Sequence, residues 1–166
     1  MNTKELYLKT AFCCMACDGD IADEEVELIS KKTTDNPELF AGLEVESMLN
    51  GYVSEINAKG ISFLSEYIRE VANASLSDDE QLQILALAVE MIEADNKIEY
   101  SEIAFFKKIR FKLSVLDDRI IELLKKETIF DKFPELRPED FILPDIVVED
   151  DLDWNASFGN IELKFG

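Results

Sequence analysis

Apolar side chains recur at every third or fourth position along most of this chain, which is the spacing of one face of an α-helix. Acidic turns, a glycine and a proline interrupt the pattern and divide it into separate segments. Seven segments result: residues 3–17, the stretch around Val26–Ile29, Leu43–Ala58, Ile61–Val71, Leu82–Ile92, Ile103–Leu113 and Leu116–Leu124. We therefore predict an all-α fold, a compact bundle of about seven helices that ends near residue 127.

Local capping signals fix several of the predicted helix ends. Ser77 stands three residues before Glu80, the spacing of a capping box in which hydroxyl and carboxylate each bond a backbone amide. Ser114 stands at the same distance before Asp117 and is predicted to cap the seventh helix. The second helix should end before Pro37, because proline disfavours helical geometry in the residue that precedes it.

The character of the chain changes after residue 127. Three prolines interrupt any helix, residues 141–143 and 146–148 are β-prone, and residues 161–165 alternate apolar with polar side chains. We therefore divide the chain into a helical domain, residues 1–127, and an acidic, aromatic-containing extension, residues 128–166. The extension either folds back as one or two short strands or waits for a partner. Its apolar side chains favour docking, because exposed apolar clusters are costly.

One acidic pattern occurs twice. Residues 18–26 recur as residues 95–103: an Asp, then Gly or Asn, then any residue, then Ile, with Glu seven positions after the Asp. The Asp of the second copy follows the Asp of the first by 77 residues, and the two Glu residues are separated by the same distance along the chain. Each copy stands between two predicted helices, so the repeat predicts a duplicated unit of helix, acidic turn and helix.

A purely structural interpretation explains every residue of the pattern. Gly19, or Asn96 in the second copy, can adopt the left-handed backbone conformation that a tight turn requires. Ile21 and Ile98 would anchor the turn in the core. The final Glu falls near the third position of the next helix, where it can bond orphan backbone amides.

A functional interpretation is that the turns bind a divalent cation. The candidate ligands are carboxylates, which hard cations prefer: Asp18, Asp20 and Glu25 in the first turn, and Asp95 and Glu102 in the second. Ca²⁺ is favoured, with Mg²⁺ or Mn²⁺ as alternatives. The spacing is not that of an EF-hand loop, and the second copy has Lys97 where the first has Asp20.

A catalytic interpretation, with paired carboxylates as acid and base, has little support. No nucleophile, phosphate-binding loop or cofactor fingerprint accompanies the turns. We therefore expect a protein that is not an enzyme and has no organic cofactor.

The three cysteines, Cys13, Cys14 and Cys17, lie close together, and the chain has no histidine. Three sulfurs without an imidazole do not complete a usual zinc site. The cysteines fall in an apolar helical run, where thiols act as small apolar side chains. Free clustered thiols fit a reducing compartment, and neither a signal peptide nor a membrane-spanning stretch is present, so we expect a cytoplasmic location.

The formal net charge of −19 is extreme for 166 residues. A chain this acidic repels nucleic-acid phosphates and anionic membranes. We therefore expect neither nucleic-acid binding nor direct membrane insertion. Another protein, one with a basic surface, or a divalent cation is the expected partner. Rows of acids could also mimic nucleic acid, a weaker alternative.

The two acidic turns, their spacing and the helical pattern around them resemble the TerB-like family of tellurite-resistance proteins. The resemblance covers residues 1–127 and implies a compact, seven-helix domain associated with stress responses, binding of divalent metals, notably calcium, and recruitment of partners. It places the functional positions at Asp18, Glu25, Asp95 and Glu102. The preferred hypothesis is a non-enzymatic, cation-binding stress-response adaptor. The alternative is a metal-independent interaction module that uses its acidic face or its extension.

Overall fold

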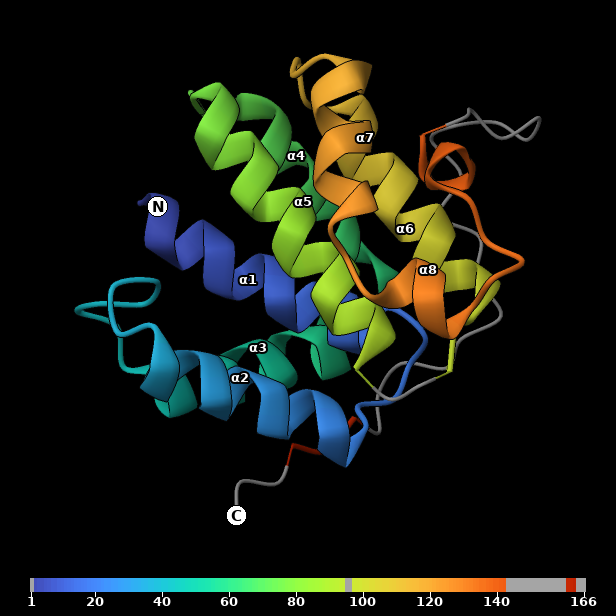
Figure 1. The fold of residues 1–166 in the computed structure, drawn as a ribbon. Helices are drawn as coiled ribbons and strands as arrows, with labels where there is room; N and C mark the ends of the chain where they lie inside the picture. The colour runs from blue at the N-terminus through green and yellow to red at the C-terminus, as the bar shows by residue number, and fades with distance from the viewer. Residues whose placement is uncertain (1, 95–96, 143–160, 164–166) are drawn as a thin grey trace.

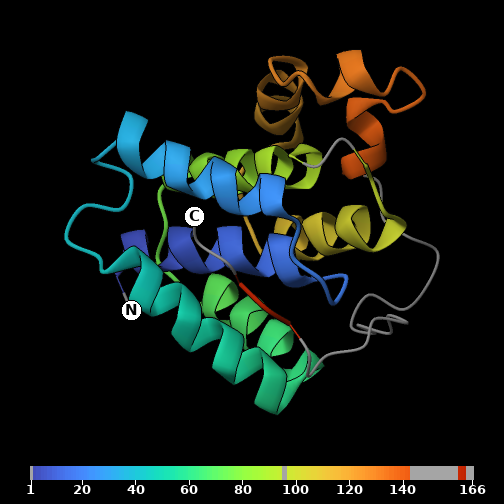
Figure 2. The ribbon, with the colours of Figure 1, turned by 90° about the horizontal axis from the view of Figure 1, so that it is seen from below.

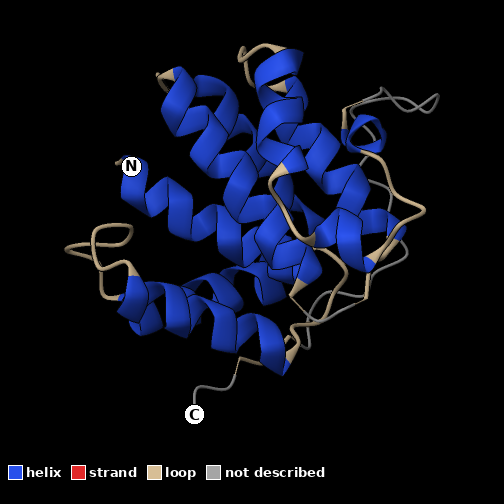
Figure 3. Ribbon diagram, viewed as in Figure 1, coloured by secondary structure: helices blue, strands red, loops and turns tan. Residues whose placement is uncertain are grey.

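The computed structural model describes residues 2–94, 97–142 and 161–163, and over these ranges the chain consists of helices and loops without a strand (Figures 1 and 3). The helices are α1 (Thr3–Ala16), α2 (Asp23–Asp35), α3 (Val45–Lys59), α4 (Ile61–Asn73), α5 (Asp78–Glu93), α6 (Tyr100–Phe111), α7 (Asp117–Lys125), α8 (Ile129–Lys132) and the 3₁₀-helix η1 (Pro138–Phe141). The all-α prediction is confirmed, and the first seven helices match the seven predicted segments.

Helix α1 lies at the centre of the bundle, where it packs against α3, α4, α5 and α6 (Figure 1). Every side chain from Leu8 to Ala16 is buried, and a helix buried on all sides belongs inside a bundle. The polar members of this run have partners: the Lys9 ammonium lies 2.5 Å from Glu70 Oε1, and the Thr10 hydroxyl lies 2.5 Å from the Tyr67 hydroxyl. Such pairing limits the cost of burying polar groups.

The predicted capping box of α5 is present. The Glu80 amide donates to Ser77 Oγ at 3.1 Å, and Glu80 Oε1 accepts the Ser77 amide at 2.9 Å. Helix α2 ends at Asp35, two residues before Pro37, as the proline predicts. These contacts are local, which is why the sequence could predict them.

The predicted cap of α7 is wrong. Ser114 does not cap this helix. Its amide donates instead to Gln81 Oε1 at 2.9 Å, and its hydroxyl accepts from Gln81 Nε2 at 3.1 Å. The N-cap position falls on Leu116, which was predicted to belong to the buried stripe but is 71% exposed. Val115 takes the core position in its place, at 5% exposure.

The described part of the extension packs on the helical domain, as its apolar side chains predict. The Phe141 ring makes edge contacts with Phe106, 5.2 Å between centroids, and with Phe130, 5.6 Å. Ile161 is buried. The β-prone run at 141–143 does not form a strand in its described part, because Pro138 opens a 3₁₀-helix that ends at Phe141. The β-prone run at 146–148 lies outside the described residues.

Candidate functional site

The first acidic turn joins α1 to α2 through a small set of local hydrogen bonds. Gly19 has φ of +91°, which glycine adopts without strain, and its amide donates to the Ala16 carbonyl at 2.9 Å. Asp18 Oδ1 accepts the Asp20 amide at 3.1 Å. Glu25 Oε1 accepts the Ala22 amide at 2.8 Å, so its carboxylate caps the start of α2.

The second turn repeats this cap 77 residues later. Glu102 Oε1 accepts the Glu99 amide at 2.8 Å, as Glu25 does for Ala22. Glu25 and Glu102 are each only 4% exposed. The structure therefore confirms that the final Glu of each copy caps the following helix. Asp95 and Asn96 lie outside the described residues.

The isoleucine of each turn faces the core. Ile21 is buried, and Ile98 is partly buried against the same core cluster. The predicted anchoring role of both isoleucines is confirmed. It holds each turn, with the carboxylates beside it, against the core.

The carboxylates of both turns act on the last turn of α1. Burial raises the pKa of the Cys14 and Cys17 thiols well above its ordinary value, and the negative charges of Glu102 and Glu25 raise it further at both positions. The negative charge of a carboxylate from each copy therefore acts on both of these thiols. All three thiols are free and buried, which confirms that they serve as apolar core side chains.

A charge in the second turn also affects a carboxyl group in the first. Burial is the main reason that the pKa of the Asp18 carboxyl is raised, and the nearby carboxylates of Asp20 and Glu99 add to the shift. Lys97 Nζ lies 3.3 Å from Glu99 Oε1 and offsets part of this negative charge. Like charges from segments that are far apart in the sequence therefore act on the Asp18 carboxyl.

The described residues do not by themselves form a metal cluster. Over residues 2–94, 97–142 and 161–163, no three carboxylates or thiols are grouped so that they could hold a metal ion. Asp20 lies at the exposed rim of the first turn, and the Oε1 atoms of Glu25 and Glu102 are engaged by backbone amides. Of the five predicted ligands, Asp95 alone lies outside these ranges.

Comparison with other proteins adds no family. No family model, curated protein or solved structure matches this chain. The likeness to TerB-like proteins therefore stays a prediction from the two turns and the helical pattern. None of the described helices is both long and apolar enough to span a bilayer.

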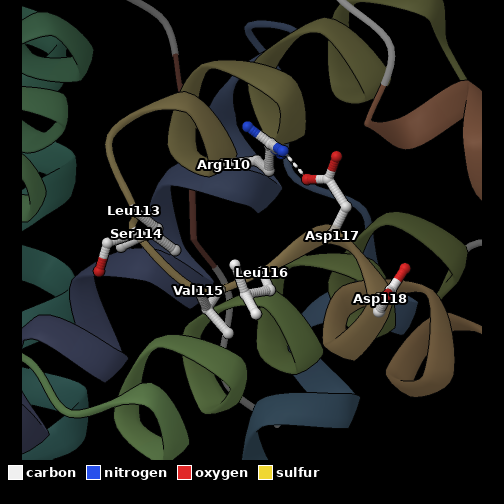
Figure 4. A pocket seen from close by; sticks show the side chains of 7 residues that line it. All are labelled: Arg110, Leu113, Ser114, Val115, Leu116, Asp117 and Asp118. Carbon is white, nitrogen blue, oxygen red and sulfur yellow. Dashed lines mark ion pairs between the residues drawn. The ribbon is translucent and has the colours of Figure 1, made fainter.

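A second surface feature was missed by the sequence analysis. The loop between α6 and α7 lines an open hollow of about 430 Å³, with Arg110 and Asp117 joined by an ion pair on one side (Figure 4). Leu116 is exposed next to Val115 (Figure 4), and Gln81 holds the loop by accepting the Ser114 and Val115 amides. The only sequence signal was the position of Leu116 directly before two aspartates that begin a helix.

Proposed function

We propose that this chain is a non-enzymatic, cytoplasmic domain of the TerB-like type that binds a divalent cation through its acidic turns. In that role it acts as a stress-response adaptor for another protein. The observation that supports the proposal is that carboxylates of both turns, Glu25 and Glu102, raise the pKa of the same two buried thiols, Cys14 and Cys17, at the end of α1.

The physical argument is one of charge. Carboxylates that share a partly buried site repel one another, and the raised pKa of Asp18 reflects both its burial and its carboxylate neighbours. A divalent cation would relieve this repulsion, and binding to the folded state alone would stabilise the fold by mass action. All predicted ligands are oxygens, so Ca²⁺ is the favoured ion, with Mg²⁺ and Mn²⁺ as alternatives.

Calorimetric titration of Ca²⁺ and of Mg²⁺ into the full chain tests the proposal. We expect saturable binding that is lost in Asp18→Asn/Asp95→Asn, because capping engages Glu25 and Glu102 and leaves the aspartates as the ligands to remove. Asp35→Asn/Glu38→Gln is the matched control. It removes two charges at the far end of α2, about 20 Å from the first turn, and should bind like the wild type.

The opposite result is equally clear. If two buffers of different protonation enthalpy show no heat, and millimolar cations leave the melting temperature unchanged, the turns are helix caps and the cation proposal is wrong. Loss of binding in the control as well would indicate general attraction to an acidic surface rather than a site at the turns.

The second candidate function is a metal-independent protein-interaction module that uses its acidic face or its extension. The observation that favours it is Leu116, which is 71% exposed beside the hollow and next to Asp117 and Asp118. An exposed aliphatic side chain with acidic neighbours suits a partner that is apolar and basic. A flat calorimetric result would make this candidate the preferred one.

A further inference from the structure

A short segment near the end of the chain lies on α3. Residues 161–163 pass between α2 and α3 (Figure 2), and Asn57 of α3 makes both hydrogen bonds to the main chain of Ile161. Asn57 Nδ2 donates to the Ile161 carbonyl at 3.0 Å, and Asn57 Oδ1 accepts the Ile161 amide at 3.0 Å. One side-chain amide therefore satisfies both backbone groups of one residue.

The side chains of the segment alternate between core and solvent. Ile161 is 3% exposed, Glu162 is exposed, and Leu163 packs partly buried against the core cluster. This alternation is that of an extended chain, whose successive side chains point to opposite sides. Extended peptides bind to proteins in this manner, with main-chain hydrogen bonds for affinity and pockets for alternate side chains.

Nothing in the main-chain contact is particular to this segment. The amide and carbonyl that Asn57 bonds are present in every residue except proline, which lacks the amide. Selection comes from the buried position of Ile161 and the half-buried position of Leu163, which require aliphatic side chains two residues apart. An extended segment of another protein with this pattern would make the same contacts.

We propose that the surface around Asn57, between α2 and α3, is a recognition site for an extended partner segment of the pattern aliphatic–any–aliphatic, which the chain's own Ile161–Leu163 occupies in cis. A partner segment then binds by displacing the cis segment, and the cis segment lowers the apparent affinity by the fraction of time that it is docked. This site uses none of the residues of the acidic turns, and the proposed binding does not depend on a cation.

The test uses the full chain and a fluorescein-labelled peptide with the sequence of residues 159–166, followed by fluorescence anisotropy. In Ile161→Ser the cis segment loses its buried side chain, so we expect the peptide to bind at least tenfold more tightly than to the wild type. Adding Asn57→Ala to that variant should weaken binding at least tenfold. A control peptide with serine in place of the isoleucine should bind neither protein.

Several results would overturn the proposal. A folded Ile161→Ser protein that does not bind the peptide, or that binds it equally well with Asn57→Ala, would mean that the contact only anchors the chain end. Dimers of the wild type that disappear in Ile161→Ser would assign the site to a second copy of this chain instead of a partner.

A second measurement applies if Ile161→Ser does not fold. NMR signals of the Asn57 side-chain amide and the Ile161 backbone amide in the wild type are followed during titration with millimolar peptide. If the peptide displaces the cis segment, the chemical shift of the Ile161 backbone amide should move towards that of a solvent-exposed amide. Unchanged signals at the highest peptide concentration would contradict the proposal.

Discussion

The two acidic turns and the loop between α6 and α7 solve the same problem in different ways. In each turn, a glutamate three residues into the next helix caps the backbone: Glu25 bonds the Ala22 amide, and Glu102 bonds the Glu99 amide. Before α7, the amides of the loop are bonded by Gln81, which is more than thirty residues earlier in the chain. The two arrangements differ in the separation along the chain of the residues that bond. Contacts within one helical turn can be predicted from the sequence, whereas contacts between distant residues depend on the fold.

The largest effect is expected from Gln81→Ala. Gln81 is 5% exposed, and its amide oxygen accepts from both Ser114 and Val115 while its nitrogen donates to the Leu76 carbonyl. Removing it leaves the buried Val115 amide and the part-buried Ser114 and Leu76 groups without their Gln81 partner, and leaves a cavity beside them. We expect a loss of about 3–4 kcal/mol in the free energy of unfolding, measured by urea denaturation.

Gln83→Ala in the same helix is the matched control. Gln83 is only half-buried, so its removal should change the free energy of unfolding by about 0.5 kcal/mol or less. Equal effects of the two substitutions would mean that the long-range bonds of Gln81 contribute nothing to stability, and the contrast between the loop and the turns would disappear.

A smaller effect is expected from the local caps. Glu25→Ala and Glu102→Ala each remove a carboxylate that bonds one backbone amide near a helix start, so each should cost about 1–2 kcal/mol. Because the two caps have the same geometry and the same burial, the two losses should agree within about 0.5 kcal/mol.

Urea denaturation of both variants, beside the control Glu24→Ala, measures this equality. Glu24 is exposed in the first turn of α2 and contributes only its interaction with the helix dipole, about 0.5 kcal/mol. If one of Glu25 and Glu102 proves worth several times the other, the repeat is a duplication of sequence that no longer has one structural role.

The same distinction of range explains what the sequence could predict. Seven helices follow from apolar spacing and from signals such as the Ser77 and Glu80 box, which act within one turn of helix. Ser114, like Ser77, stands three residues before an acidic residue, but its amide and hydroxyl are hydrogen-bonded by the distant Gln81 instead. Phe141 likewise packs against the rings of Phe106 and Phe130 and does not form the strand that its β-propensity favours.

The candidate site divides in the same way. The roles of Glu25 and Glu102 as caps and of Ile21 as an anchor could be derived from the pattern, because each acts within its own turn. That carboxylates of both turns act on the Cys17 thiol depends on how α1, α5 and α6 pack, which the sequence alone does not show. Cation binding stays a prediction, since it depends on carboxylates from both turns, and Asp95 is outside the described residues.

The smallest effect, and the only stabilising one, is expected from Leu116→Ser. Leucine is among the poorest N-cap residues, and Leu116 makes no side-chain hydrogen bond at the start of α7. It is also 71% exposed, so little buried area is lost with it. A serine hydroxyl at this position can accept an orphan amide of α7, so thermal denaturation should show a gain of about 0.5–1 kcal/mol.

Tyr100→Ser is the control for Leu116→Ser, because Tyr100 is 67% exposed and does not occupy an N-cap. It should leave the stability almost unchanged. A loss of stability in Leu116→Ser would mean that Leu116 packs on the loop in solution and is a structural residue. A gain would mean that this chain keeps a leucine where serine serves the fold better. Selection tolerates such a cost where an exposed side chain contacts a partner, so a gain would favour the interaction surface beside α7.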